Sequence, residues 1–177
     1  MGSRVVILNA SAVHRVLTRI AHEIAERNEE GSKVVIIGIQ TGGVHLARRL
    51  ADILTTIWNQ KVSVGTLDVS MHRDDLSQHA APNIHPTNIA FDINDKTVVL
   101  VDDVLFSGRT TRAALDALND FGRPARIQLA VLVDRGHREL PLKADFVGKN
   151  VPSGLNERID VKLKEDHGED IVFLEKA

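Results

Sequence analysis

Short apolar runs rich in β-branched residues alternate along this chain with stretches of helical periodicity. The run at 34–39 (VVIIGI) is apolar throughout, which is typical of a strand buried on both faces of a sheet. Apolar residues then recur at helical spacing over 43–58. Because parallel neighbouring strands need a crossover between them, this alternation predicts a mostly parallel sheet flanked by helices and joined by right-handed crossovers. The predicted fold class is α/β.

The alternation continues over all 177 residues, and we expect a single domain spanning 1–177. Helices are predicted over about 10–28, 43–58 and 107–121, and strands over 34–39, 62–69, 97–101, 127–133, 146–151, 159–163 and 171–174. The turn residues at 166–168 predict that the last two strands form a β-hairpin. The stretch from 72 to 95 is rich in Pro, Asn and His and lacks periodicity, so we expect a long, flexible functional loop there.

Composition excludes several classes of protein. The chain has no cysteine, which removes disulfide scaffolds and thiolate chemistry and fits a cytoplasmic protein. No apolar run is long enough to cross a bilayer, and no secretory signal is expected, so no membrane partner is predicted. With 22 Lys and Arg against 24 Asp and Glu, the net charge is −2, which argues against binding nucleic acid through bulk positive charge. The net charge does not exclude nucleic-acid binding through a local basic face.

The segment 98–111 (VVLVDDVLFSGRTT) carries the clearest chemistry. A predicted strand ends at two carboxylates, Asp102 and Asp103, and a short loop then leads into a helix. The first N–H groups of a helix lack intrahelical acceptors and attract anions, and Gly108 allows a close backbone approach. The carboxylates would repel a phosphate, but they can accept hydrogen bonds from vicinal hydroxyls or serve a hard cation. The segment therefore predicts a site for a ribose 5-phosphate.

Other phosphate-binding motifs are absent from the sequence. There is no G-x-x-x-x-G-K-[ST] loop and no G-x-G-x-x-G dinucleotide motif. Two Asp at a strand end, or Ser and Thr at a helix start, are each common on their own. The complete ordered string is much rarer, and it carries the prediction.

Residues 98–110 resemble the signature that binds 5-phosphoribosyl 1-pyrophosphate (PRPP) in type I phosphoribosyltransferases. Further segments resemble, in the same order, the family of pyrimidine operon regulatory proteins: 17–23, 73–76, 122–124, 128–141 and 144–152. The resemblance covers nearly the whole chain. It implies the type I phosphoribosyltransferase fold, with a flexible hood loop over the site and a C-terminal β-hairpin.

The resemblance also implies roles for individual residues. The predicted PRPP- and nucleotide-binding residues are Thr41, Gly42, Gly43, Asp102, Asp103, Val104, Leu105, Phe106, Ser107, Gly108, Arg109 and Thr110. Arg73, Asp102 and Asp103 are the predicted catalytic residues, and the two Asp would also serve a Mg²⁺ ion held mainly through PRPP. Asp74 or Asp75 are further candidates for a contribution beside Arg73 at the leaving group. Val133, Asp134 and Arg138 would approach the base.

Two departures from the family pattern affect this site. The family usually carries Arg in the pyrophosphate loop, where this chain has Gly42, so a bidentate guanidinium is lost. The usual Tyr residues at 72 and 106 are His72 and Phe106. We expect the loss of the hydroxyls to be tolerated, whereas Gly42 bears on PRPP affinity and turnover.

Two groups of side chains are candidates for RNA binding. Arg15, Thr18, Arg19 and His22 share one face of the first predicted helix, with Arg27 further along. His137, Arg138 and Lys143 form a second group, in which Lys143 replaces the family's usual Arg. On charge alone these are ordinary solvated side chains. By resemblance, both groups belong to one surface that binds a leader mRNA.

The leading hypothesis is a bifunctional regulator of pyrimidine genes. It would bind operon leader mRNA in response to UMP or UTP and would also convert uracil and PRPP to UMP and pyrophosphate. One alternative is mainly a phosphoribosyltransferase for uracil or another base, without RNA regulation. Another is an RNA regulator with little turnover. By resemblance, a homodimer or homotetramer is expected.

Overall fold

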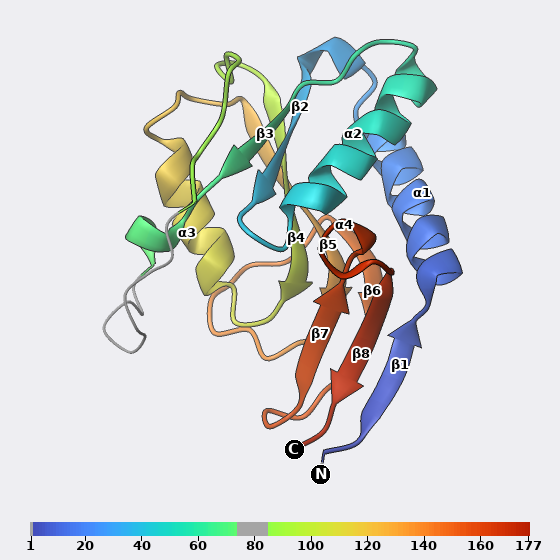
Figure 1. Ribbon diagram of the computed structural model, residues 1–177. Helices are drawn as coiled ribbons and strands as arrows, with labels where there is room; N and C mark the ends of the chain where they lie inside the picture. Colours follow the sequence, from blue (N-terminus) through green and yellow to red (C-terminus); the bar gives the residue numbers. More distant parts are fainter. Residues whose placement is uncertain (1, 74–84) are drawn as a thin grey trace.

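The computed structural model describes residues 2–73 and 85–177, and its centre is a five-stranded parallel sheet in the order β3-β2-β4-β5-β6 (Figure 1). The strands span Val64–Leu67 (β3), Val34–Ile39 (β2), Thr97–Leu105 (β4), Arg126–Asp134 (β5) and Phe146–Asn150 (β6). Short 3-10 turns lie at Gly31–Lys33 and Ser70–His72. The parallel sheet confirms the predicted fold class.

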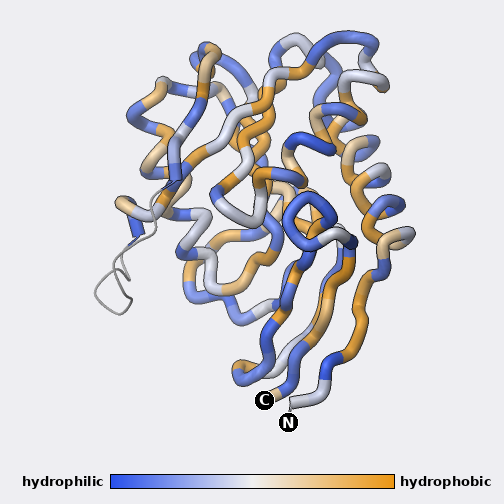
Figure 2. The backbone as a smooth tube through the Cα atoms, viewed as in Figure 1, coloured by the Kyte–Doolittle hydropathy of each residue, from blue (hydrophilic) through white to orange (hydrophobic). Residues whose placement is uncertain are grey.

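Helices cover both faces of this sheet. α1 (Ala10–Arg27) and α2 (Val44–Trp58) lie on one face and α3 (Arg109–Leu118) lies on the other (Figure 1). Two apolar cores result, one between the sheet and α1 and α2 and the other beneath α3. Figure 2 shows largely apolar strands in the middle of the domain, with helices of mixed hydrophilic and hydrophobic residues on either side. Ligands of such sheets bind beyond the carboxyl ends of the strands, where the β2–α2 and β4–α3 loops lie.

A small antiparallel sheet, β1-β8-β7, brings the two ends of the chain together (Figure 1). Its strands are Arg4–Leu8 (β1), Arg158–Lys162 (β7) and Ile171–Glu175 (β8), and the short helix α4 (Lys164–His167) joins β7 to β8. The predicted pairing of the last two strands is confirmed. β1 was not predicted, although residues 5–8 form a short apolar run; it is an edge strand, and its Val5 and Val6 are about half exposed.

β4 is longer than the sequence predicted. It continues through Asp102 and Asp103 to Leu105, because its parallel pairing with β5 runs as far as Leu105 opposite Asp134. The two carboxylates therefore stand within a hydrogen-bonded strand and not at its end. The following helix begins at Arg109, two residues later than the predicted start, and ends three residues earlier, at Leu118.

The described part of the predicted 72–95 loop is held against the sheet from residue 85 onward. The N–H of His85 donates to Asp68, Asn88 forms a bridge with Thr66 of β3, and Ile93 is fully buried. The predicted flexibility therefore does not apply to 85–95. Asp74 and Asp75 lie outside the described residues. In the described parts of the chain, no helix is long and apolar enough to cross a membrane.

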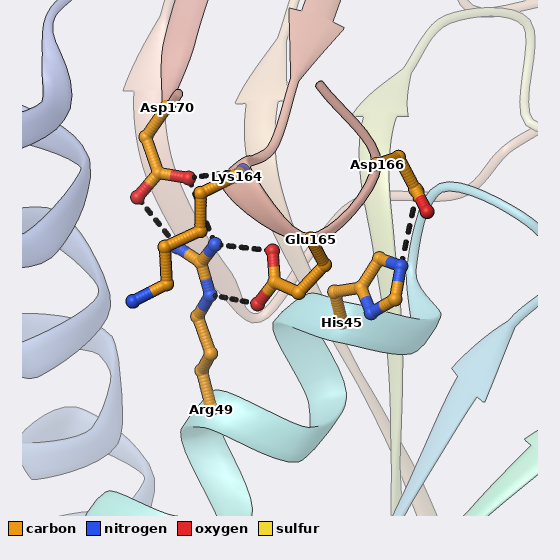
Figure 3. Close-up of polar contacts among 6 residues, drawn as sticks. All are labelled: His45, Arg49, Lys164, Glu165, Asp166 and Asp170. Atoms are coloured by element: carbon orange, nitrogen blue, oxygen red, sulfur yellow. Dashed lines mark hydrogen bonds and ion pairs between the residues drawn. The ribbon is translucent and has the colours of Figure 1, made fainter. Parts of the chain in front are cut away.

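An ion-pair cluster fastens α2 to the small sheet (Figure 3). The Arg49 guanidinium donates two hydrogen bonds to Glu165, of 2.8 and 2.6 Å, and two to Asp170, of 2.9 and 2.8 Å. One turn earlier in α2, His45 contacts Asp166 at 3.0 Å. Both contacts lie in the first half of the helix, which directly follows the Thr41–Gly43 loop.

Candidate active site

The loop between β4 and α3 places polar groups around the start of a helix. Gly108 adopts a left-handed φ of 93°, which turns the chain into α3, and its carbonyl accepts the first helical bond from Arg112 at 2.9 Å. The hydroxyl of Ser107 accepts a hydrogen bond from the Arg109 N–H at 3.3 Å. A cavity of about 100 Å³ lies here, lined among others by Asp102, Ser107, Gly108 and Thr110.

Asp102 and Asp103 stand side by side before this loop, and their charges interact. Burial and the neighbouring Asp103 carboxylate raise the pKa of Asp102 well above its usual 3.8, although Arg73 acts in the opposite direction. Asp103 is oriented by the N–H of Val104, which donates to its Oδ1 at 2.7 Å. The strand therefore presents two acceptor groups that a diol or a cation would stabilise.

The Thr41–Gly43 loop lies directly against these carboxylates. Gly43 caps α2, and a side chain on Gly42 would collide with the carboxylate of Asp103, since a Cβ there would lie closer than 3.0 Å to three of its atoms. The predicted pyrophosphate loop and the predicted ribose-binding residue are thus in contact. The sequence places them about 60 residues apart, and the parallel pairing of β2 with β4 brings them together.

Arg73 lies between the two loops. It donates to the Thr110 hydroxyl at 3.2 Å, and it lines both the 100 Å³ cavity and a neighbouring cavity of about 310 Å³. Thr41, Asp68 and Thr110 are among the other residues that line the larger of these two. The Arg73 side chain therefore borders both halves of any ligand that spans the two cavities.

A still larger open cavity, of about 440 Å³, lies at the other end of the sheet. Arg27, Asn28, Val34, Thr97 and Arg126 line it, at the amino ends of β2, β4 and β5. Ligands of parallel sheets bind at the opposite, carboxyl ends. The smaller cavities around Arg73, at the carboxyl ends of the strands, are therefore the candidate ligand site.

The comparisons with known proteins agree with this geometry. Residues 7–164 match the model of the phosphoribosyl transferase domain. The bifunctional protein PyrR of Roseiflexus sp. is 59% identical over 95% of this chain and 93% of its own length, and that of Listeria welshimeri is 52% identical over 99% of both. The chain belongs to the PyrR family of phosphoribosyltransferases. This confirms the family expected from the sequence and, at the level of that family, an enzyme that is also a regulator of pyrimidine genes.

Solved structures support the fold. The hypoxanthine phosphoribosyltransferase of Trypanosoma cruzi, in complex with the product IMP, superposes with a TM-score of 0.72 at 19% identity, covering 98% of this chain and 90% of the other. A hypoxanthine-guanine phosphoribosyltransferase of Bacillus anthracis gives 0.70 at 17% identity over 97% of both chains. At these identities the likeness shows the type I phosphoribosyltransferase fold alone.

The predicted base-binding residues lie at the end of β5, but their side chains are largely occupied. Val133 is fully buried, so its side chain has no access to a ligand. Asp134 accepts from the Gly136 N–H and from Arg138, and Arg138 in turn donates to the carbonyls of Phe106 and Leu142. Arg138 is therefore engaged within the fold, where its side chain ties the loop between β4 and α3 to the segment after β5.

Sequence reasoning missed two polar residues at the site. Arg135 is 8% exposed, lies 4.2 Å from the centre of the Phe106 ring, and donates to Ser153 and to the Gly154 carbonyl. Burial lowers the pKa of its guanidinium. Asp68 follows β3; burial acts to raise its pKa, but hydrogen bonds from Ser70 and His85 outweigh this and lower it. Its position just past a strand end was the available signal.

The predicted RNA-binding groups flank β6. Arg19 donates to the carbonyls of Val147 and Gly148 and to Glu23, and Arg27 pairs with Asp145 at 3.3 Å. Arg15 donates to Ser11, while His22 and Lys143 are exposed. His137 contacts the Ser153 carbonyl, five residues beyond Gly148. The edge strand β6 contacts the group on α1, and Ser153, which follows this strand, contacts His137 of the second group.

The donor set fits a magnesium ion held through a ligand and not a closed metal cage. The described residues contain no cluster of three or more His, Asp or Glu suited to a metal. Mg²⁺ commonly binds through one or two carboxylates together with substrate phosphates and water. Asp102, which lines the small cavity, and its neighbour Asp103, whose charge interacts with it, supply that number of carboxylates.

Proposed function

We propose that the protein catalyses the transfer of a phosphoribosyl group from PRPP to uracil and that it binds pyrimidine leader mRNA when a uridine nucleotide occupies the same site. The observation that carries the enzymatic half is the contact between Gly42 and Asp103. It joins a pyrophosphate loop to a ribose-binding carboxylate, next to an anion-binding helix start. One site then accepts all three parts of PRPP.

Each residue contributes a separate interaction. Asp102 and Asp103 accept hydrogen bonds from the 2- and 3-hydroxyls, while the backbone from Val104 to Thr110 holds the 5-phosphate at the start of α3. The Thr41–Gly43 backbone binds pyrophosphate. When bound, Mg²⁺ neutralises charge on the pyrophosphate, and Asp102 and Asp103 are the residues that would hold it.

Displacement at C1 of the ribose breaks the bond to pyrophosphate oxygen and forms a bond to uracil nitrogen. Positive charge develops on the sugar and negative charge on the leaving group. Arg73, between the two cavities, donates to the departing pyrophosphate and stabilises that charge. Excluding water from the site protects the sugar cation from hydrolysis.

The regulatory half uses the basic side chains on both sides of β6. Arg15, Thr18, Arg19, His22 and Arg27 of α1, with His137 and Lys143, form the proposed RNA surface. Arg and Lys contact phosphates, and Thr and His read unpaired bases. Such a regulator works in the cytoplasm, as a homodimer or homotetramer.

The test measures both activities on one sample. Uracil with Mg–PRPP should give UMP, Asp103→Asn should abolish it, and Asp116→Asn, on the exposed side of α3, should not change it. UMP should tighten binding to a leader hairpin. Turnover without RNA binding would support only the enzymatic half of the proposal. UMP-dependent RNA binding without turnover would support only the regulatory half. Absence of both would refute the proposal.

A further inference from the structure

The segment after β5 is folded back onto the loop between β4 and α3, residues 106–108, which we call the phosphate loop. We call residues 135–142 the strap. The guanidinium of Arg138 donates to the carbonyl of Phe106 at 2.6 Å, and the N–H groups of Glu139 and Leu140 donate to the carbonyl of Ser107 at 2.9 and 3.3 Å. Two successive carbonyls of the loop are therefore held by donors from the strap.

These bonds determine where the loop's own donors point. In a trans peptide the C=O of one residue and the N–H of the next point in opposite directions. With the Phe106 and Ser107 carbonyls turned to the strap, the N–H groups of Ser107 and Gly108 point away from it. The small cavity lined by Ser107, Gly108 and Thr110 lies beside this loop. The strap thus orients the N–H groups that a 5-phosphate would engage.

Side chains reinforce the same connection. The Phe106 ring packs against the Arg135 guanidinium at 4.2 Å and edge-on against the His137 ring at 5.9 Å. Arg109, at the start of α3, pairs with Glu139 at 3.2 Å. Arg138 is the centre of the strap, because its Nε, Nη1 and Nη2 donate to Leu142, Phe106 and Asp134 respectively. With all three nitrogens engaged inside the protein, its guanidinium is not presented to RNA.

The strap also carries the second proposed RNA-binding group. His137 lies within it and Lys143 directly follows it, and Lys143 is exposed. We propose that the strap transmits occupancy of the phosphate loop to the RNA surface, with Arg138 as a positioning residue and Lys143 as the phosphate contact. This inference rests on the proposed function and assigns the mechanism of its regulation.

Arg138→Lys separates positioning from contact. It keeps the positive charge but cannot donate in three fixed directions. Affinity for a leader hairpin is measured with and without saturating UMP over a salt series, for the wild type, R138K, K143Q and R48K. Arg48 is exposed on α2, so R48K is a matched control.

We expect R138K to weaken UMP binding about tenfold, the effect of losing one charged hydrogen bond. The ratio of RNA affinities with and without UMP should fall toward one, with the salt slope unchanged. K143Q should weaken RNA binding by the same factor with and without UMP and lower the salt slope by about one phosphate contact. R48K should behave as the wild type.

The inference is overturned if R138K keeps the wild-type UMP ratio, or if it lowers the salt slope as K143Q does. If R138K does not fold, Asp134→Asn, which removes the charge from one of the three acceptors, should also reduce the ratio, and an unchanged ratio would refute coupling. If the wild type shows no RNA response to UMP, the proposed function fails. Direct titration of R138K with UMP then still tests whether the strap orients the phosphate loop.

Discussion

Gly42 lies so close to Asp103 that the Asp103 carboxylate can occupy its position only because residue 42 has no side chain. The colliding atoms belong to the end of the Asp103 side chain and not to the backbone. A larger residue at position 42 would therefore displace the carboxylate while leaving the main chain intact. Such a substitution would therefore impair ligand binding at the site without disrupting the fold.

Gly42→Ala should fold with nearly unchanged stability and lose turnover. Its Cβ would push the Asp103 carboxylate out of the position in which it accepts from Val104, so the ribose hydroxyls lose an aligned acceptor. We expect kcat/KM for PRPP to fall by about tenfold or more, the effect of one hydrogen bond to a charged group. Steady-state kinetics and thermal unfolding check this.

Gly154→Ala is the matched control, because a Cβ there would have no neighbour closer than 3.7 Å. It should leave both turnover and stability unchanged. Gly42→Arg should not raise PRPP turnover, although it restores the family's usual arginine, because its Cβ would collide with the Asp103 carboxylate in the same way. Higher PRPP turnover in that variant would contradict the account of Asp103.

Asp102→Asn should stabilise the protein while abolishing turnover. The folded-state pKa of Asp102 is raised, so between the usual 3.8 and that higher value the folded chain holds a proton that the unfolded chain has lost. Stability therefore falls as pH rises through this window. Removing the charge should raise Tm at pH 7 by about 2–4 °C, the effect of 1 kcal/mol in a domain of this size.

The stabilisation by Asp102→Asn should shrink as pH approaches 3, where the wild-type carboxyl is protonated in both states. Calorimetry in EDTA without PRPP measures it, and Asp116→Asn serves as the exposed control. A destabilised D102N at pH 7 would show that the Asp102 charge is favourable in the free protein.

The parts of the structure that could be predicted are those with a local signal. β2 is apolar throughout, β4 and β5 contain the apolar runs 98–101 and 129–133, and the order of residues 98–111 indicated a phosphate next to a diol. β1 contains a short apolar run (VVIL, 5–8), but its pairing with β8 joins segments about 170 residues apart and has no local signal. The extension of β4 through two Asp arises from tertiary pairing that overrides their low strand propensity.

Side-chain partnerships were less accessible to sequence reasoning. Arg138 was predicted to touch base and RNA, because a basic residue after a strand end is typical of either role. Its three acceptors come from β5, the phosphate loop and the strap, and their convergence is a property of the folded chain. Buried Arg135 and the contact of Gly42 with Asp103 were hidden for the same reason.

Arg49→Met should destabilise the fold by about 2 kcal/mol at pH 7, because it removes four charged hydrogen bonds from partly buried groups. Arg49 lowers the pKa of Glu165. At Asp170, burial acts to raise the pKa, but the hydrogen bonds and charges of Arg49 and Lys164 together outweigh it and lower the pKa. Stability from depressed carboxyl pKa values is present above their usual 4.5 and 3.8 and is lost as pH falls through the lower folded-state values.

The deficit of R49M should therefore shrink on acidification below about pH 4. Denaturant unfolding across pH 3–8 provides the measurement. Arg48→Met changes the neighbouring exposed arginine and should have little effect. An R49M deficit that does not depend on pH would mean that packing, and not charge, is what Arg49 contributes.

Substitutions in α1 should separate RNA contact from structural support. Arg19 donates to two carbonyls of β6, so Arg19→Gln should cost about 1–2 kcal/mol of stability and also weaken leader binding. His22, one turn along the same face, is exposed, so His22→Ala should weaken RNA binding with stability unchanged. Thermal unfolding, together with RNA affinity measured at one temperature in the presence of UMP, distinguishes the two effects. Unchanged RNA affinity in H22A and R19Q together would remove α1 from the RNA surface, whereas a loss in R19Q alone would show that α1 acts by holding β6 in place.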